Sequence, residues 1–422
     1  MSEPTEMWRN SSSPGTCSER GGAVPPGDEI RVAVFGGSLQ GTEVLYLARK
    51  AGWRTLLVDR NEQAPARTLA DRFVCTEIER IHDPNAFLKA CRLMVPALED
   101  DEALERLQAI SRETGVPLAH DPEAYAVSSS KVASDDLFRK LGVPAPRPHP
   151  SNRFPVIAKP DRGSGSRGVR VFADEGSLSR WLCGRQDPHR WVIQEFIQGP
   201  TFSVEVVGNG REYETGPVTD LHMDADYDCK RVTAPSELAD SLQEKMAALA
   251  LRLAGALNLR GIMDLEVVFD GRDLLALEID ARFPSQTPTV VYWSEGVNLL
   301  EILGLMALDP ESPPRPWRRG GHRAVLYEHV QVRNGRLYVA GEHVMAKAKA
   351  LRVVPGFFGS REAVTDHVPG AREWVATLIF VSDRVKDVWA QRHRALERMV
   401  GELGLKGVED SMPCREGEGV GP

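Results

Sequence analysis

The chain has 422 residues, of which 42% are hydrophobic and 27% are charged, and this composition indicates a globular protein with two to four domains. Its formal net charge of −8 argues against general binding to nucleic acid, and no apolar run is long enough to span a bilayer. The six cysteines are scattered without a C-x-x-C pair, so we expect reduced thiols and a cytoplasmic protein. Residues 1–29 and 409–422 are expected to be disordered tails, because they are poor in apolar residues.

Residues 30–122 predict a Rossmann-like domain. Ile30 to Phe35 is a short apolar strand that runs into the segment GGSLQG and a helix, and a second apolar strand ends at Asp59. Glycines at a helix N-terminus can bind an anion or a ligand carboxylate. The spacing is not G-x-G-x-x-G, so an alternative is that these glycines serve tight packing in a doubly wound domain.

Two polar residues of this domain are candidates for ligand binding. Gln40 belongs to the GGSLQG segment, and Glu99 follows a predicted strand at Leu93–Pro96. In open α/β sheets, the residues just beyond the strand C-termini line the crevice. Asp100 and Asp101 instead favour the start of the next helix, where carboxylates interact well with the helix dipole.

A glycine-rich flap follows in the next region. A helix begins near Lys131, and the strand FPVIAKP carries Lys159 near its end. The sequence DRGSGSRG, residues 161–168, lies between two predicted strands, and the backbone N–H groups of such a loop can cover phosphates. Lys159 could pair with phosphate oxygens, although a lone lysine at this place would more often be a surface residue.

The next strand and turn suit an adenine ring. Trp191–Glu195 is a predicted strand, and Phe196–Pro200 turns the chain before a further strand at Phe202–Val207. Backbone groups at a strand edge can recognise the edge of the ring, while Phe196 or Ile197 can pack on its face.

The strongest chemical signal is a predicted β-hairpin within residues 261–288. LEVVF is rich in β-branched and aromatic residues, D-G is a turn signal, and LLALEI returns as the partner strand. Side chains two residues apart on a strand share a face. Asp264 and Glu266 therefore point the same way, as do Glu278 and Asp280.

These clustered carboxylates predict a Mg²⁺ site. Like charges repel unless a cation lies between them, and Mg²⁺ prefers carboxylate and phosphate oxygens as ligands. Arg282 follows Asp280 by two residues, where its guanidinium could hold a phosphate through two hydrogen bonds. The alternative is an amphipathic hairpin with a solvated acidic face, but here the acids are set within apolar runs.

The two lysines, the GSGSRG flap, the segment QEFIQG and the acidic hairpin with its arginine together resemble the ATP-grasp ligases. The resemblance implies an ATP-grasp fold of mixed α/β and α+β type. Its parts would be the Rossmann-like domain (30–122), the nucleotide-binding and catalytic region (123–310) and a C-terminal α+β domain (311–408). Such enzymes hold ATP between two lobes and join a carboxylate to a nucleophile through an acyl phosphate.

Within that family, four further segments are similar to the ligases of pyrrolysine biosynthesis, which join 3-methyl-D-ornithine to the ε-amine of L-lysine. The segments are GGSLQG, SVEVVGNG, YDCKRVT and DARFPSQTPTVVYWS. Asp280 stands where ATP-grasp proteins usually have Asn, and this departure is shared with that subgroup. The implied partners are these two small molecules, with neither nucleic acid nor a membrane, and a homodimer is a candidate assembly.

The resemblance assigns residues to each ligand. It implies that ATP contacts Lys131, Lys159, Ser166, Glu195, Phe196, Ile197 and Gln198, and that Mg²⁺ is bound by Glu266, Glu278 and Asp280. It implies that methylornithine contacts Ser203, Val204, Glu205, Asp264, Arg282, Phe283, Pro284, Ser285, Gln286 and Thr287. Lysine would contact Leu39, Gln40, Glu99 and Ser285. Lys159 and Arg282 would act catalytically, by neutralising charge during phosphoryl transfer.

Two departures lie on the lysine side, and three other functions are open. Ser38 stands where relatives can carry Lys, and Leu98-Glu99-Asp100 stands where they can carry Asn-Glu-Asn. The chain could be a ligase for another amino acid or peptide, a nicotinamide-dependent oxidoreductase, or a nucleotide sensor without catalysis. The oxidoreductase leaves the acidic hairpin and the flap unexplained. The sensor should have lost the acidic residues that are present here.

Overall fold

The computed structural model describes residues 30–150, 153–163, 165–183, 190–314, 317 and 323–412. The predicted tail 1–29 and most of the predicted tail 409–422 lie outside these ranges. Within them, no single helix is long and apolar enough to cross a membrane. Two apolar helices, α8 (Thr287–Glu295) and α9 (Leu299–Leu308), have the length and composition of a membrane span only when they are taken together. The chain bends by 103° between them.

The N-terminal domain is built on a parallel four-stranded sheet in the order β3-β2-β1-β4. Its elements are β1 (Arg31–Phe35), α1 (Leu39–Lys50), β2 (Arg54–Asp59), β3 (Arg72–Cys75), α2 (Asn85–Leu88), β4 (Leu93–Pro96) and α3 (Asp101–Thr114). Alternate residues of β1 enter different cores: Val32 and Val34 pack with α1, while Ala33 and Phe35 pack with α3. A parallel sheet covered on both faces is what a Rossmann-like domain requires.

The glycines of GGSLQG are needed for close packing. Gly36 has a φ of +104°, and a Cβ there would lie 2.4 Å from the carbonyl oxygen of Ala97. A Cβ on Gly41 would lie 2.0 Å from the carbonyl oxygen of Gly36. Helix α1 therefore approaches the end of β1 more closely than any other residue type would permit.

A second, twelve-stranded sheet runs through the rest of the molecule, with the main order β13-β12-β8-β10-β11-β14-β18-β17-β16. Its strands are β8 (Thr201–Asn209), β9 (Tyr213–Thr215), β10 (Thr219–Met223), β11 (Cys229–Ala234), β12 (Arg260–Phe269), β13 (Leu274–Asp280), β14 (Ala324–Arg333), β15 (Arg336–Val339), β16 (Arg352–Pro355), β17 (Glu362–Thr365), β18 (Trp374–Ser382) and β19 (Val408–Asp410). Because β11 pairs with β14, one sheet continues from the region 123–310 into the region 311–408, which the sequence predicts to be separate parts.

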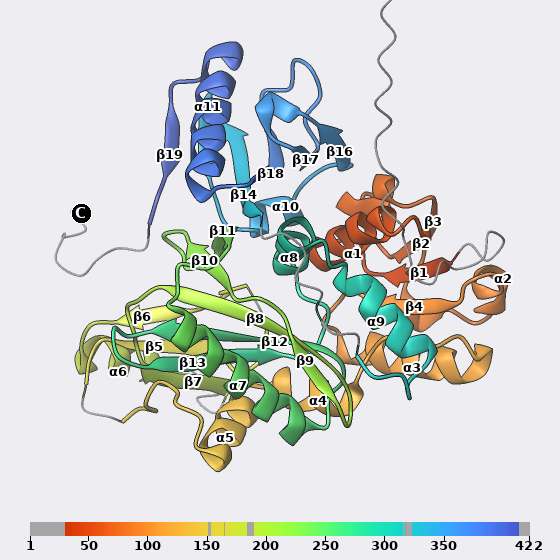
Figure 1. The fold of residues 1–422 in the computed structure, drawn as a ribbon, viewed down its shortest axis with the longest axis horizontal. Coiled ribbons are helices and arrows are strands. Elements are labelled where there is room, and N and C mark those ends of the chain that lie inside the picture. The colour runs from red at the N-terminus through yellow and green to blue at the C-terminus, as the bar shows by residue number, and fades with distance from the viewer. Residues whose placement is uncertain are drawn as a thin grey trace, which may run out of the picture.

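Helices cover this sheet at several places (Figure 1). They are α4 (Pro122–Ser128), α5 (Lys131–Leu141), α7 (Asp240–Leu257), α8 and α9, and, on the C-terminal domain, α10 (His343–Ala346) and α11 (Val385–Leu403). The core beneath α7 contains Met246, Leu253 and Leu265. Helix α11 packs on β14 and β18.

A small three-stranded sheet shares no strand with the large sheet, and it overlaps strands β12 and β13 in the view of Figure 1. It has the order β6-β5-β7, from β5 (Val156–Pro160), β6 (Arg170–Phe172) and β7 (Trp191–Glu195), and it packs on α6 (Glu175–Cys183). Its own small core includes Val156, Phe172 and Leu178. The two sheets and the N-terminal domain give the mixed α/β and α+β architecture that the sequence predicted.

The C-terminal end of the chain differs from the prediction. We expected a tail from Glu409, but Glu409 and Asp410 belong to β19, which pairs with β15. Asp410 accepts hydrogen bonds from Lys230 at 2.6 Å and from Arg231 at 2.8 Å. These buried cations need a carboxylate partner, which explains why the chain remains ordered here.

Candidate functional site

Two rows of polar side chains cross strands β8, β12 and β13. The pairing register places Asp264 opposite both Glu205 and Asp280, and it places Glu266 opposite both Ser203 and Glu278. Since directly opposite residues share a face of a sheet, the rows Glu205–Asp264–Asp280 and Ser203–Glu266–Glu278 lie side by side on one face. The other face of the same strands carries Val204, Leu265 and Ile279, which pack in the core.

A β-bulge in β13 was not expected from the sequence. Glu266 pairs with Glu278, but the next residue, Val267, pairs with Ala276, so Leu277 is an extra residue. Leu277 and Glu278 are both partly exposed and both line the same cavity.

Burial and mutual repulsion disfavour ionisation in this acidic cluster. Desolvation, followed by Glu278 and Asp280, raises the pKa of Glu266 to about 8. Desolvation also raises the pKa of Asp280 to about 7, and it raises the pKa of Asp264 well above its ordinary value. A divalent cation would reverse this effect, because it stabilises the ionised form of each ligand.

Two basic side chains partly neutralise the charge of these acids. Lys131 Nζ lies 2.7 Å from Glu278 Oε1, and Arg282 donates to Asp280 Oδ2 at 2.8 Å.

Among the residues that the structure describes, no three His, Cys, Asp or Glu side chains form a ready cation site. The donor set nevertheless fits Mg²⁺, since it offers hard carboxylate oxygens beside a nucleotide-sized cavity.

The predicted ATP contacts border one cavity of about 1720 Å³ between the small sheet and the large one. Those predicted contacts are Lys131, Lys159, Ser166, Glu195, Phe196, Ile197 and Gln198. The metal candidates Glu266 and Glu278 border it too, whereas Asp280 borders the adjoining space. Burial lowers the pKa of Lys159, and an anionic phosphate would favour its charged form again.

A second space, which we call the acceptor pocket, lies beyond the acidic rows. It is lined by Asp264, Arg282 and the loop Pro284 to Thr287, together with Asp228 and Glu342. Three buried acceptor atoms there, Asp264 Oδ1, Asp228 Oδ1 and Gln286 Oε1, have no hydrogen-bond partner among the described residues. A buried acceptor without a donor is costly, so the pocket suits a ligand rich in N–H groups.

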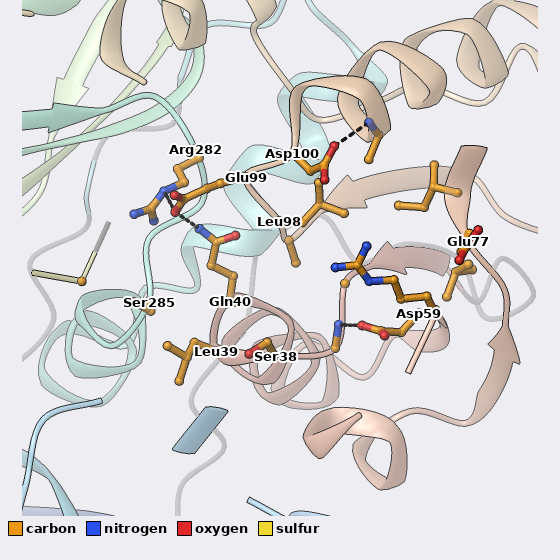
Figure 2. A pocket seen from close by; sticks show the side chains of 18 of the residues that line it. Ser38, Leu39, Gln40, Asp59, Glu77, Leu98, Glu99, Asp100, Arg282 and Ser285 are labelled. Carbon is orange, nitrogen blue, oxygen red and sulfur yellow. Dashed lines mark hydrogen bonds and ion pairs between the residues drawn. The ribbon is translucent and has the colours of Figure 1, made fainter. Parts of the chain in front are cut away.

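A third space, the N-terminal crevice, holds the residues assigned to lysine (Figure 2). Gln40 donates to Glu99 at 3.2 Å, and Arg282 Nε lies 2.8 Å from the same carboxylate oxygen. Leu39 and Ser285 line the same crevice. Arg282 therefore stands between the crevice and the acceptor pocket, in contact with acids from both.

Four residues assigned to methylornithine do not line the acceptor pocket. Val204 is fully buried and Phe283 is 4% exposed, and both side chains belong to the hydrophobic core. Ser203 and Glu205 are also buried, directly beside Glu266 and Asp264 on the neighbouring strand β8. Burial raises the pKa of Glu205 to about 7.

The C-terminal domain contributes residues that the sequence did not single out. Glu342 accepts hydrogen bonds from Ser285 at 2.8 Å and from Gln286 at 2.9 Å. His343 follows it and contacts Asp228. No sequence motif marks Glu342 or His343. Each reaches the site through contacts with residues more than fifty positions earlier in the chain.

Comparisons with known proteins agree with this geometry. Residues 128–286 match the family model of the ATP-grasp domain. The 3-methyl-D-ornithine–L-lysine ligase of Methanosarcina mazei is 37% identical over 383 residues, which cover 88% of this chain and 96% of that protein. The enzyme of the same name from Methanosarcina acetivorans is 36% identical over 324 residues, covering 75% of this chain and 84% of that protein.

A solved structure supports the fold independently. The biotin carboxylase domain of Hydrogenobacter thermophilus 2-oxoglutarate carboxylase, in complex with MgADP, ADP and bicarbonate, superposes with a TM-score of 0.67 at 16% identity. The match covers 87% of this chain and 89% of that one. The acidic rows, the glycine-rich flap and these relatives lead to one conclusion: the chain belongs to the 3-methyl-D-ornithine–L-lysine ligase family of ATP-grasp enzymes.

Proposed function

We propose that this enzyme uses ATP to join the carboxylate of (3R)-3-methyl-D-ornithine to the ε-amine of L-lysine, releasing ADP and phosphate, in pyrrolysine biosynthesis. The acceptor pocket is the main support for this proposal. There, Asp264, Asp228 and Gln286 present hydrogen-bond acceptors that have no partner among the described residues. A diamino acid with two ammonium groups supplies the donors that these atoms lack.

The reaction needs the carboxylate to be activated first. Its oxygen attacks the γ-phosphorus of ATP, ADP leaves, and an acyl phosphate remains; the lysine amine then attacks the acyl carbon and phosphate leaves. Lys131 and Lys159 border the nucleotide cavity, where they would hold phosphate oxygens. Mg²⁺ bound by Glu266, Glu278 and Asp280 would supply further neutralisation of the phosphate charge.

Arg282 would orient the acid that is being phosphorylated. Arg282 lines both the acceptor pocket and the N-terminal crevice, which supports this role because the two substrates would meet between these spaces. Glu99 and Gln40 would receive lysine, because an acidic side chain facing an open crevice can bind an ammonium group. This arrangement separates the two substrates on opposite sides of one guanidinium.

Product analysis tests the proposal. The enzyme would be incubated with ATP, Mg²⁺, 3-methyl-D-ornithine (or D-ornithine) and L-lysine, and the products analysed by mass spectrometry. We expect the amide of the two amino acids and one ADP for each amide. ADP release with other amino acids or peptides, but not with these, would favour the alternative of an ATP-grasp ligase for another pair.

The same proposal includes a cytoplasmic, homodimeric enzyme. The cysteines that the structure describes, Cys75, Cys91, Cys183 and Cys229, are all free thiols, which suits a reducing compartment. Light scattering of the purified protein would measure its mass in solution and decide between monomer and dimer.

A further inference from the structure

The tip of the glycine-rich flap rests on a histidine of the C-terminal domain. Arg167 Nε donates a hydrogen bond to His343 Nε2 at 3.0 Å. A Cβ on Gly165 would lie 2.6 Å from His343 Cε1, so the flap backbone itself touches the imidazole. Gly165 borders the nucleotide cavity, the acceptor pocket and the N-terminal crevice, and the flap position therefore affects all three.

A second contact anchors the flap close by. Ser166 donates from its hydroxyl to the backbone carbonyl of Tyr227 at 2.6 Å. Tyr227 and Asp228 are neighbours in the short loop between β10 and β11. This loop therefore contacts Ser166 directly and, through Asp228, contacts the histidine that Arg167 reaches. The ring of Tyr227 also packs against Phe196 of the nucleotide cavity, with ring centres 5.6 Å apart.

Asp228 fixes the orientation of His343. Asp228 Oδ2 lies 2.6 Å from His343 Nδ1, and it also accepts from the backbone N–H of His343 at 3.1 Å. Gly341 leaves the room for this, since a Cβ there would lie 2.0 Å from the same oxygen. The imidazole is thus held from one side and contacted by the flap on the other.

The chemistry of arginine determines the protonation state of the imidazole. A guanidinium has only donors, so His343 Nε2 must accept the hydrogen bond from Arg167. A histidine that accepts at Nε2 is neutral and carries its proton on Nδ1, which then donates to Asp228. Protonation would place an N–H on each nitrogen and would set an imidazolium against a guanidinium.

We propose that His343, oriented by Asp228, is a positioning residue that docks the flap over the substrate sites by accepting a hydrogen bond from Arg167, and that protonation of His343 releases the flap. This inference rests on the proposed function, for which the flap must cover ATP and both substrates. The charged groups that face His343 are Asp228, Glu342 and Arg167.

The neighbours of His343 raise its pKa above the ordinary value of a histidine. The hydrogen bond with Asp228 raises the pKa of His343, burial opposes that rise, and Arg167 opposes it as well. Acidification therefore has two opposite effects at one residue. It strengthens the ion pair with Asp228, and it removes the acceptor that Arg167 needs.

Four variants test the proposal: His343→Ala, Arg167→Ala, the double variant and His343→Gln. ATP-dependent ADP release is measured with D-ornithine, and hydrogen exchange of the peptide that contains the flap tip is measured with ATP and Mg²⁺ but without amino acids. Each alanine variant should lower kcat/KM for ATP roughly tenfold and speed flap exchange, because a hydrogen bond to a charged group is lost. The double variant should lose no more than either single variant.

His343→Gln distinguishes positioning from a merely structural role. A glutamine amide oxygen can accept from Arg167 but does not titrate, so activity at neutral pH should stay within about threefold of the wild type. The wild type should lose activity and flap protection together as the pH falls, and His343→Gln should keep both. The control is Arg170→Ala, which removes an exposed arginine three residues further along the chain.

Three results would overturn the docking role. The first is a loss of kcat/KM in the double variant that equals the two single losses combined. The second is the same loss of activity at low pH in His343→Gln as in the wild type. The third is hydrogen exchange of the flap that does not differ between His343→Ala and the wild type. Arg167 is exposed, so its variant should fold even where a His343 variant does not. Because flap exchange is measured without turnover, it separates failure of docking from failure of the proposed reaction, which would appear as no ADP release by the wild type.

Discussion

Glu266 and Glu278 lie directly opposite one another on β12 and β13, and both border the nucleotide cavity. Two like charges in this relationship destabilise a sheet. Burial and its acidic neighbours raise the pKa of Glu266 to about 8. The fold therefore bears a cost at this pair that a cation would remove.

Glu266→Gln should stabilise the enzyme in the absence of Mg²⁺ and nucleotide. Folding raises the pKa of Glu266 from about 4.5 to about 8, so the folded state holds this proton more tightly than the unfolded state. The free energy of unfolding therefore falls as the pH rises from about 4.5, and the loss is complete above about pH 8. The variant should gain at most about 4 kcal/mol at pH 8 and almost nothing at pH 4. Urea unfolding measures the difference, with the exposed Glu212→Gln as control; an equal gain at both pH values would contradict this account.

Glu278→Gln should abolish most product formation while leaving the fold intact. One neutralised ligand weakens the positioning of Mg²⁺–ATP, and Lys131 loses its ion pair with Glu278 at 2.7 Å. Steady-state turnover at several Mg²⁺ concentrations provides the test. Near-normal turnover in a well-folded variant that still requires Mg²⁺ would remove Glu278 from the metal site.

Asp264→Asn and Glu99→Gln should separate the two substrates. Asp264 faces the acceptor pocket, so its variant should lose D-ornithine-dependent ADP release measured without lysine. Glu99 faces the N-terminal crevice, so its variant should retain that release but need at least tenfold more lysine, since an ion pair with an ammonium group is lost. The reverse pattern would show that the substrates occupy each other's sites.

Tyr46→Phe should weaken the junction of the three main parts of the molecule. The Tyr46 hydroxyl donates to Glu362 at 2.8 Å and accepts from Trp293 Nε1 at 2.9 Å, which joins α1, β17 and α8. Loss of the hydroxyl leaves a buried indole N–H without its acceptor and should cost about 1–3 kcal/mol of unfolding free energy. Tyr338→Phe on β15 is the matched control, and an equal effect of both variants would argue against this role for Tyr46.

The sequence was sufficient for those parts of the site that lie within one hairpin or one loop. The two-residue period of a strand predicted the shared faces of Asp264 with Glu266 and of Glu278 with Asp280, and the register confirms it. The same alternation places the Val204 side chain on the core face.

Contacts between distant elements were beyond the reach of the sequence. Glu342 meets Ser285 because the large sheet continues from the catalytic region into the C-terminal domain, and no local pattern encodes that continuity. The link from Arg282 to Glu99 was hidden for the same reason: each residue was predicted separately, but their separation of 2.8 Å depends on how two domains pack.

The extra residue in β13 lets one strand present two neighbouring side chains to the same cavity. A regular strand would turn either Leu277 or Glu278 away, yet both border the nucleotide cavity, one apolar and the other acidic. Removing the codon for Leu277 would leave a regular hairpin with Glu278 still opposite Glu266 and Ala276 still in the core. In evolutionary terms, a single inserted codon adds an apolar wall to this cavity in an acidic hairpin, and it leaves the pairing of Glu266 with Glu278 and the hydrophobic core undisturbed.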